Sequence, residues 1–193
     1  YPQPPMPEGV QEGVIRGMYR YREADTDHDL RVQLFGSAVA LNEALRAQEM
    51  LGKEFGVSAD VWSVTSYQEL RHDAVTTSRW NMLHPEEEPR VSYLQKTMEG
   101  VEGPFIAVTD YMTLVPDQIR RWLPGTLISL GTDGFGMSDT RESLRRYFEV
   151  DAESIVIATL HALKKDGKVD GATVTAAIKK LDYDPDKLRA TSI

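Results

Sequence analysis

Short apolar runs alternate with amphipathic stretches through most of the chain. The runs at 32–35, 59–64, 105–109 and 126–130 have the length and composition of strands that are buried on both faces. The stretch 41–55 instead spaces its leucine, alanine and phenylalanine residues as one apolar stripe on a helix. Strands that alternate with helices in this way predict a mostly parallel sheet covered by helices on both faces.

A different pattern precedes these runs. Between residues 18 and 23 tyrosine alternates with arginine, and this period of two predicts a half-exposed strand. The polar stretch 24–29 predicts a turn and 31–36 a second strand, so the two strands are predicted to pair as an antiparallel hairpin at a sheet edge. The predicted fold class is an α/β three-layer sandwich with a mostly parallel five-stranded sheet and one antiparallel edge strand.

Caps and prolines mark several helix boundaries. Ser66 with Glu69 has the form of a capping box that opens a helix, whereas the polar stretch 76–90 is predicted to be a long irregular connection. Pro116 is placed to begin a helix and Pro124 to end it, since proline fixes its backbone dihedral and lacks an amide hydrogen.

The last part of the chain, from residue 131 on, is predicted to consist of a turn followed by helices. The segment Gly131–Gly136 predicts a turn after the last strand, and a charged helix is predicted from about residue 139 to 148. Asp151 and Asp170 are predicted to cap two further helices.

Composition narrows the classes of function. The chain has 193 residues with 22 Lys and Arg against 30 Asp and Glu, a formal net charge of −8, which opposes binding to nucleic acid. It has no cysteine, which excludes disulfides, thiolate nucleophiles and cysteine-ligated metal sites. No apolar run approaches the roughly 20 residues of a membrane helix, so the predicted location is the cytoplasm.

Proline is concentrated at the start of the printed sequence. Four of the ten prolines lie in the first seven positions, and such a segment is stiff and extended. Residues 1–9 are therefore interpreted as a linker from a preceding domain and 10–193 as an α/β domain. A processed N-terminus is the alternative interpretation.

The residues after the predicted strands are candidates for ligand binding. Ser37, Ser66, Asp110 and Asp133 follow four strands, at the sheet edge where open α/β folds bind ligands. Helix N-termini favour anions there. The alternative is that these residues only cap helices, for which Ser, Thr and Asp are well suited.

No sequence motif for a known reaction centre stands out. The glycines of 131–136 follow the order G-x-x-G-x-G, which is not the dinucleotide fingerprint, and Phe135 at this turn favours an interface over a phosphate site. The histidines are scattered without a metal-ligand spacing, and no G-x-S-x-G elbow occurs. On these grounds the chain is a binding module or a piece of an enzyme without its catalytic centre.

Several long stretches nevertheless resemble one family. It is the C-terminal domain of the homodimeric pyruvate dehydrogenase first component, an acetyl-transferring, thiamine-diphosphate-dependent enzyme of the transketolase-like superfamily. The stretches that carry the resemblance are Tyr-Pro-Gln-Pro-Pro-Met-Pro-Glu-Gly at 1–9, 13–19, 59–71, Trp-Asn-Met-Leu-His-Pro at 80–85, and 131–152. The resemblance covers essentially the whole chain, and these stretches occur in the right order.

The resemblance implies an enzyme of three α/β domains. Thiamine diphosphate and magnesium would lie between the first two domains at the dimer interface, and the acetyl unit from pyruvate would pass to a lipoyl group. The family's cofactor motif begins Gly-Asp-Gly, which is absent here, so no catalytic, cofactor-binding or metal-binding residue is predicted in this chain and no activity is expected of it alone. The implied partners are the preceding domains, a homodimer partner and the dihydrolipoyl acetyltransferase component.

The role that remains for this domain is structural. It would complete the dimer and shape the rim of the active-site entrance. Arg141 and Arg145 are four residues apart and share one helix face, which suits a docking surface or, alternatively, a solvated face. The candidate interface or rim residues are Asp133, Gly134, Phe135, Ser138, Arg141 and Arg145.

Two other hypotheses stay open. The first is a free-standing interaction or regulatory module of the same fold that docks to an acyltransferase complex. The second keeps the enzyme class but changes the substrate to 2-oxoglutarate or a sugar phosphate, because substrate choice rests on the resemblance alone.

Overall fold

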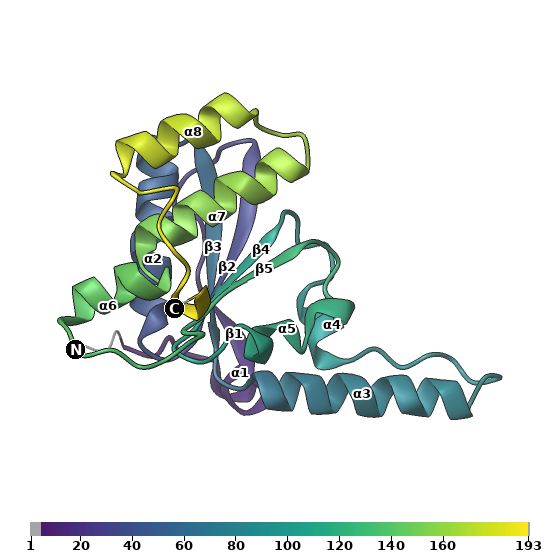
Figure 1. Ribbon diagram of the computed structural model, residues 1–193. Coiled ribbons are helices and arrows are strands. Elements are labelled where there is room, and N and C mark those ends of the chain that lie inside the picture. Colours follow the sequence, from purple (N-terminus) through teal and green to yellow (C-terminus); the bar gives the residue numbers. More distant parts are fainter. Residues whose placement is uncertain (1–4, 193) are drawn as a thin grey trace.

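Five strands form one mixed sheet in the computed structural model, which describes residues 5–192 (Figure 1). The sheet order is β1-β3-β2-β4-β5, with β1 antiparallel to β3 and all other neighbours parallel. The predicted sheet, with one antiparallel edge strand, is therefore confirmed. The strands are β1 (Met18–Arg22), β2 (Leu30–Gly36), β3 (Val57–Val64), β4 (Phe105–Val108) and β5 (Leu127–Leu130).

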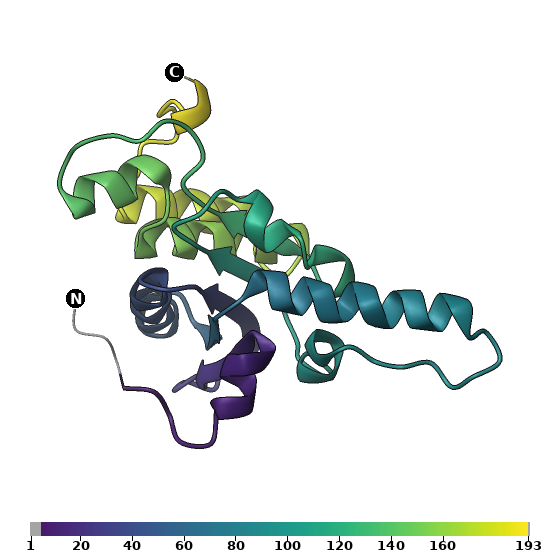
Figure 2. The same cartoon turned by 90° about the horizontal axis from the view of Figure 1, so that it is seen from below.

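Helices cover both faces of this sheet, as predicted for three layers. Helices α2 and α7 pack on one face with α8 behind α7, while α3, α4 and α5 lie on the other side (Figures 1 and 2). The helices are α1 (Gln11–Arg16), α2 (Ala40–Glu54), α3 (Tyr67–Leu83), α4 (Tyr93–Thr97), α5 (Leu114–Asp117), α6 (Arg141–Phe148), α7 (Ala152–Lys165) and α8 (Gly171–Lys180), with short 3-10 turns η1 (Arg120–Trp122) and η2 (Ala190–Ser192).

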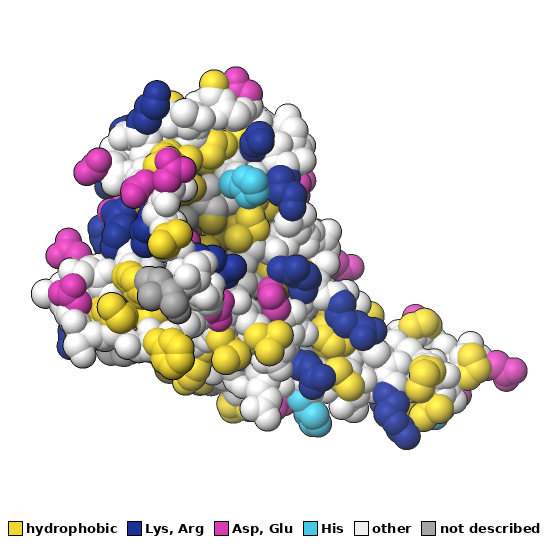
Figure 3. Space-filling model, viewed as in Figure 1, with side chains coloured by type: hydrophobic (Ala, Val, Ile, Leu, Met, Phe, Trp, Pro, Cys, Tyr) yellow, Lys and Arg dark blue, Asp and Glu magenta, His cyan; other side chains and the backbone are white. Residues whose placement is uncertain are grey.

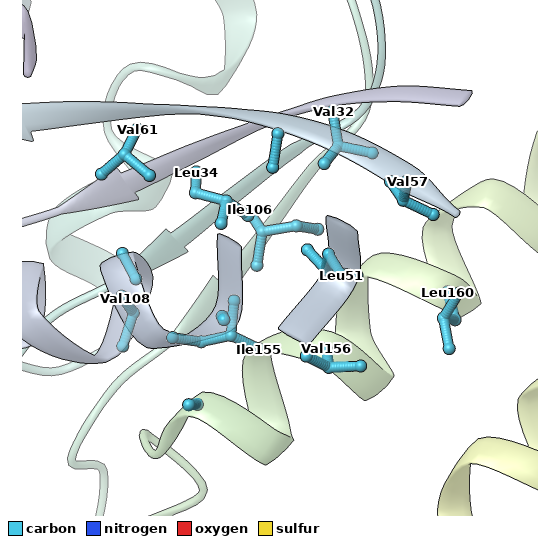
Figure 4. Packing of buried hydrophobic residues seen from close by; sticks show 14 of the residues in the cluster. Val32, Leu34, Leu51, Val57, Val61, Ile106, Val108, Ile155, Val156 and Leu160 are labelled. Atoms are coloured by element: carbon cyan, nitrogen blue, oxygen red, sulfur yellow. The ribbon is translucent and has the colours of Figure 1, made fainter. Parts of the chain in front are cut away.

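Side chains alternate between two cores along the central strands. Val32 and Leu34 of β2 point into the core against α2 and α7, which Figure 4 shows together with Ile155 of α7. Phe35 points to the opposite face and packs in the second core with Trp62. Successive strand residues face opposite sides of a sheet, so a strand covered on both faces must be apolar at nearly every position.

The predicted hairpin between the first two strands is wrong. Strand β1 pairs with β3 instead, with Tyr19 opposite Ser63 and Arg20 opposite Trp62. Strand β2 has no edge left for β1, because it pairs in parallel with β3 on one side and β4 on the other. The alternation of tyrosine and arginine identified an edge strand correctly but carried no information about which strand lies beside it.

The predicted irregular connection at 76–90 is also partly wrong. Ser66 caps α3 as expected, its hydroxyl oxygen accepting a hydrogen bond from the Glu69 amide at 3.1 Å, but α3 continues as far as Leu83. Its outer half is exposed, so there was no apolar stripe to reveal a helix there. The helix predicted near Pro116 consists of the short α5 and the turn η1.

The predicted caps of the last two helices are confirmed. The Asp151 carboxylate accepts a hydrogen bond from the Ser154 amide at 2.9 Å and caps the start of α7. The Asp170 carboxylate accepts one from the Thr173 amide at 2.8 Å and caps the start of α8. Of the predicted linker 1–9, residues 1–4 lie outside the described residues, and its interpretation as a linker stays a prediction.

Candidate functional site

The carboxyl ends of the parallel strands meet at one sheet edge. The Ser and Thr residues that follow these strands use their hydroxyl groups in hydrogen bonds within the protein. The Ser37 hydroxyl donates to Thr109 Oγ1 at 2.8 Å in the interior, and Thr109 Oγ1 also accepts the Tyr111 amide at 3.2 Å. Thr65 at the end of β3 donates its hydroxyl to the Val14 carbonyl. These bonds within the protein favour the interpretation of the strand-end residues as structural rather than as an anion site.

Asp133 holds the loop that follows β5 against the start of α5. Its carboxylate accepts the Thr113 amide at 3.0 Å and the Thr113 hydroxyl at 2.8 Å, and Arg189 lies 3.6 Å away. The neighbouring Thr132 hydroxyl donates to the Asp110 carbonyl at 2.6 Å. This candidate rim residue therefore positions the loop rather than presenting a free carboxylate.

The C-terminal residues return to the same loop. Lys187 Nζ donates to the carbonyls of Arg146 and Tyr147 at 2.7 and 2.8 Å, at the end of α6. Gly134 has a φ of +108°, and a Cβ atom there would lie only 2.7 Å from the Ala190 carbonyl oxygen. The loop and residues 187–192 thus form one unit, and this contact requires a glycine at 134.

A group of exposed apolar side chains lies on this edge of the sheet, and we call it the apolar rim. Phe135 is 85% exposed on the loop that precedes α6. Figure 3 shows hydrophobic side chains along the lower edge of the molecule, over α5 and this loop. The apolar rim consists of Tyr111, Met112, Leu114, Phe135 and Met137. Exposed apolar residues that gather in this way mark surfaces for binding another protein surface.

Helix α6 is fixed to the body through a buried carboxylate. Glu43 of α2 is only 2% exposed and accepts a hydrogen bond from Arg145 Nη1 at 2.5 Å. Its second oxygen accepts Arg46 Nη1 at 2.8 Å and the Ala152 amide at 3.2 Å. One carboxylate therefore joins α2, α6 and the first turn of α7.

The two candidate arginines of α6 are placed differently. Arg145 faces inward to Glu43, while Arg141 is exposed at the start of the helix, and both take part in interactions. Ser138 is exposed in the loop, and Thr140 caps the helix by accepting the Ser143 amide at 3.2 Å. The ion pair with Glu43 gives Arg145 a holding role, and the exposed candidates are Gly134, Phe135, Ser138 and Arg141.

Asp110 at the end of β4 offers a test of the electrostatics at this edge. Asp110 is exposed at the surface, but partial desolvation raises the pKa of its carboxyl above the ordinary 3.8, and the charge of Arg145 acts in the opposite direction. The ionised form of Asp110 is thus disfavoured in the folded state. Ionisation of this carboxyl therefore lowers the stability of the fold as the pH rises through the folded-state pKa. Because water screens the charge of an exposed side chain, we expect Asp110→Asn to be only slightly more stable than the wild type at neutral pH, with an advantage that shrinks towards pH 4.

Urea unfolding from neutral pH down to about pH 4 measures this difference. Asp166→Asn, at an exposed turn after α7, is the matched control and should change little at any pH. A neutral-pH stability of Asp110→Asn equal to or below that of the wild type would contradict the assigned cause.

The other candidate groups do not assemble into a reaction centre. His28 bonds to the Gly52 carbonyl at 3.1 Å and His84 stacks on Trp80, while His72 and His161 are exposed on separate helices. Between residues 5 and 192 no three acidic or histidine side chains are grouped so that they could hold a metal ion. The same part of the chain contains no helix with the length and apolar character needed to cross a membrane.

Comparison with known proteins identifies the family. A family model described as "Transketolase-like TK C-terminal domain" matches residues 17–151. This chain belongs to that family. The resemblance stated from the sequence is therefore confirmed at the level of the family and of its relatives.

Curated relatives of this transketolase-like domain include pyruvate dehydrogenase E1 components. The chain is 49% identical to the one from Mycobacterium tuberculosis over 185 residues, which is 95% of this chain and 20% of that protein. For the Escherichia coli protein the identity is 46% over 189 residues, 97% of this chain and 21% of that protein. The chain thus spans about one fifth of the length of these relatives.

Solved transketolases share the fold. The enzyme from Leishmania mexicana matches with a TM-score of 0.53 at 23% identity, covering 82% of this chain and 20% of that one. A transketolase from Pichia stipitis matches with a TM-score of 0.54 at 15% identity, over 82% of this chain and 20% of that one. At these identities the likeness concerns the architecture and not the reaction.

Sequence reasoning missed two parts of the site. The first is Glu43, which lies inside the apolar stripe predicted for 41–55; an acidic residue on that stripe was the available signal. The second is the loop after β4, with Tyr111, Met112 and Leu114, where three large apolar residues within four positions could have been noticed.

Proposed function

We propose that this chain is the C-terminal domain of an acetyl-transferring, thiamine-diphosphate-dependent pyruvate dehydrogenase. The observation that carries the proposal is the identity of 41–49% to pyruvate dehydrogenase E1 components across at least 95% of this chain. In this proposal the domain is structural: it forms part of the dimer contact and of the rim around the active-site entrance. It acts in the cytoplasm and is inactive alone.

The residues of this chain do not fit the cofactor. Thiamine diphosphate is held through a magnesium ion in the proposed enzyme class, and residues 5–192 offer no grouped carboxylates or histidines for such an ion. The Gly-Asp-Gly motif is likewise absent from the sequence. We therefore place the cofactor and the chemical steps in the preceding domains and derive no step through this chain.

The geometry of the sheet edge supports a docking role. The loop that carries Phe135 is held on both sides, by Thr113 through Asp133 and by residues 187–192, while its apolar side chains stay exposed. A held apolar surface loses little conformational freedom when it is covered, which favours association. Its proposed partners are the preceding domains and a second copy of the enzyme, and the dihydrolipoyl acetyltransferase component would receive the acetyl group.

The decisive experiment is to isolate the native polypeptide from its source. We expect a mass several times the 21.7 kDa of this chain and decarboxylation of pyruvate that requires thiamine diphosphate and magnesium. The 193-residue chain alone should show neither turnover nor calorimetric binding of the cofactor. A native polypeptide of the size of this chain would contradict the proposal and favour the free-standing module instead.

Charge placed on the apolar rim should weaken the dimer of the full-length enzyme. We expect Phe135→Asp to raise the dimer dissociation constant by roughly 10-fold or more, because a carboxylate would then lie in an apolar contact. Analytical ultracentrifugation measures this constant. Ala176→Asp, on the exposed surface of α8, is the matched control and should leave the constant unchanged. Equal dimer dissociation constants for the two variants would contradict the proposal that the apolar rim takes part in the dimer contact.

A further inference from the structure

The outer half of α3 and the chain that returns from it project away from the body of the domain. Figures 1 and 2 show this projection from two sides, and we call residues 75–91 the arm. Ala74 is the last buried residue of α3, and none of the arm residues is buried. The arm therefore makes no part of either hydrophobic core.

The arm is nevertheless well ordered by its own contacts. The Trp80 ring is stacked on the His84 ring, with centroids 4.3 Å apart. The Arg90 guanidinium lies over the Trp80 ring, 3.7 Å from the centroid of that ring. Asn81 bonds to both backbone groups of Arg90, donating to its carbonyl at 2.9 Å and accepting its amide at 2.8 Å. These bonds close the returning chain onto the helix.

The base of the arm is anchored just as firmly. Asp73 accepts the Tyr93 amide at 2.7 Å and Arg16 Nη2 at 3.2 Å. Trp122 donates its indole hydrogen to Ser78 Oγ at 3.1 Å. An element that is rigid at both its base and its tip is preorganised for binding, because little conformational entropy is lost when a partner covers it.

The far end of the arm exposes apolar side chains. Met82 is 70% exposed and Leu83 51%, and Figure 3 shows hydrophobic side chains at this end of the molecule. Val91, 48% exposed, lies instead at the base of the arm, just before Ser92 begins α4. Helix residues that bury no apolar face gain little stability from tertiary contacts. An ordered helix end that carries exposed methionine and leucine is therefore suited to insertion into an apolar pocket on another surface.

The charge of the tip argues against a second copy of this domain as the partner. Glu86, Glu87 and Glu88 follow Leu83 and lie between Pro85 and Pro89, all of them exposed. A two-fold contact through the tips of two arms would bring one glutamate run against the other, and the whole chain carries a formal charge of −8. Charge complementarity instead calls for a partner surface rich in lysine or arginine.

We propose that the arm inserts into an apolar pocket rimmed by lysine and arginine residues on the domains that precede this one in the longer polypeptide. This inference rests on the proposed function, since about four fifths of the length of the curated relatives lies outside the matched segment. Met82 and Leu83 fill the pocket, and Glu86–Glu88 face its basic rim. The arm thereby adds a second attachment between the domains, separate from the apolar rim.

Cysteine labelling tests this proposal directly, because the wild-type chain contains no cysteine. Met82→Cys is introduced into both the full-length enzyme and the 193-residue chain, and reaction with a maleimide is followed by mass spectrometry of the peptide that carries the new cysteine. We expect labelling at this position to be roughly 10-fold slower in the full-length enzyme. Lys179→Cys on the exposed face of α8 is the matched control and should react at equal rates in both proteins.

The outcomes separate this proposal from the proposed function. An active full-length enzyme in which Met82→Cys reacts as fast as in the 193-residue chain overturns the arm proposal and leaves the function standing. Slow labelling in the 193-residue chain at high concentration that becomes fast on dilution identifies a second copy as the occupant and also overturns it. A native polypeptide without preceding domains overturns both proposals.

Charge reversal at the tip tests the basic rim. The combined variant Glu86→Lys, Glu87→Lys and Glu88→Lys is built in the full-length enzyme that carries Met82→Cys. We expect it to restore most of the labelling rate seen in the 193-residue chain, because three cations would then face the lysine and arginine residues. Protection that survives this reversal rules out the charge complementarity. The corresponding triple change to Gln should give an intermediate rate.

Discussion

Replacing Glu43 by alanine is expected to lower the free energy of unfolding by about 3–5 kcal/mol, the usual cost of removing one partner from a buried ion pair. The carboxylate is buried and accepts hydrogen bonds from Arg145, Arg46 and the Ala152 amide. Its loss would take one charged acceptor from the partly buried Arg145 guanidinium and from the buried amide at the start of α7. Urea denaturation followed by circular dichroism measures the change.

Two control variants separate the buried contact from the exposed one. Glu43→Gln keeps the shape and one acceptor oxygen, so it should lose less stability than Glu43→Ala. Arg46→Ala removes a partner whose side chain is 57% exposed, and it should cost no more than about 1 kcal/mol. A loss for Glu43→Ala as small as that for Arg46→Ala would show that the carboxylate does not hold α6 and α7 together.

Phe35→Ala is expected to lower the free energy of unfolding by about 3–5 kcal/mol, because it leaves a cavity in the second core. The Phe35 side chain is fully buried on β2. Its ring packs against Phe105 with centroids 5.5 Å apart and against Trp62 with centroids 6.5 Å apart. Thermal and urea unfolding of the 193-residue chain measure the loss.

The exposed phenylalanine of the same chain is the natural control. Phe135→Ala removes the same side chain from a position that is 85% exposed, so the stability of the 193-residue chain should change by less than about 0.5 kcal/mol. Similar losses at the two positions would mean that Phe135 is packed rather than exposed. The contrast also shows that any effect of Phe135 on the full-length dimer arises from association and not from folding.

The parts of the fold that follow from local chemistry could be predicted from the sequence. The β4 run Phe-Ile-Ala-Val is apolar at every position because both faces of the sheet are covered, and Asp151 caps α7 through a bond to an amide three residues away. Such signals span only a few residues. They determine whether an element is a helix or a strand and where it ends. The family was identified separately, from the resemblance of several long stretches of the sequence.

The parts that depend on distant pairs could not be predicted. Glu43 and Arg145 are 102 positions apart, and an acidic residue in one helix says nothing about which arginine it will meet. The neighbour of β1 is decided by β2, which uses both of its edges in parallel pairs. The outer half of α3 lacks an apolar stripe, since none of its residues is buried and Ser78 meets the rest of the domain through a hydrogen bond from Trp122. In the first two cases the deciding contact lies far along the chain, and in the third no burying contact exists among the described residues.

The return of residues 187–192 to the loop that carries Phe135 has a practical consequence for work on this protein. Lys187 donates hydrogen bonds to two backbone carbonyls at the end of α6, and the Ala190 carbonyl lies against Gly134. An affinity tag fused beside these residues would sit next to the surface whose association is to be measured, and a truncation that removed them would leave the loop held by the contact between Asp133 and Thr113. Binding studies should therefore use untagged protein or cleave the tag before measurement.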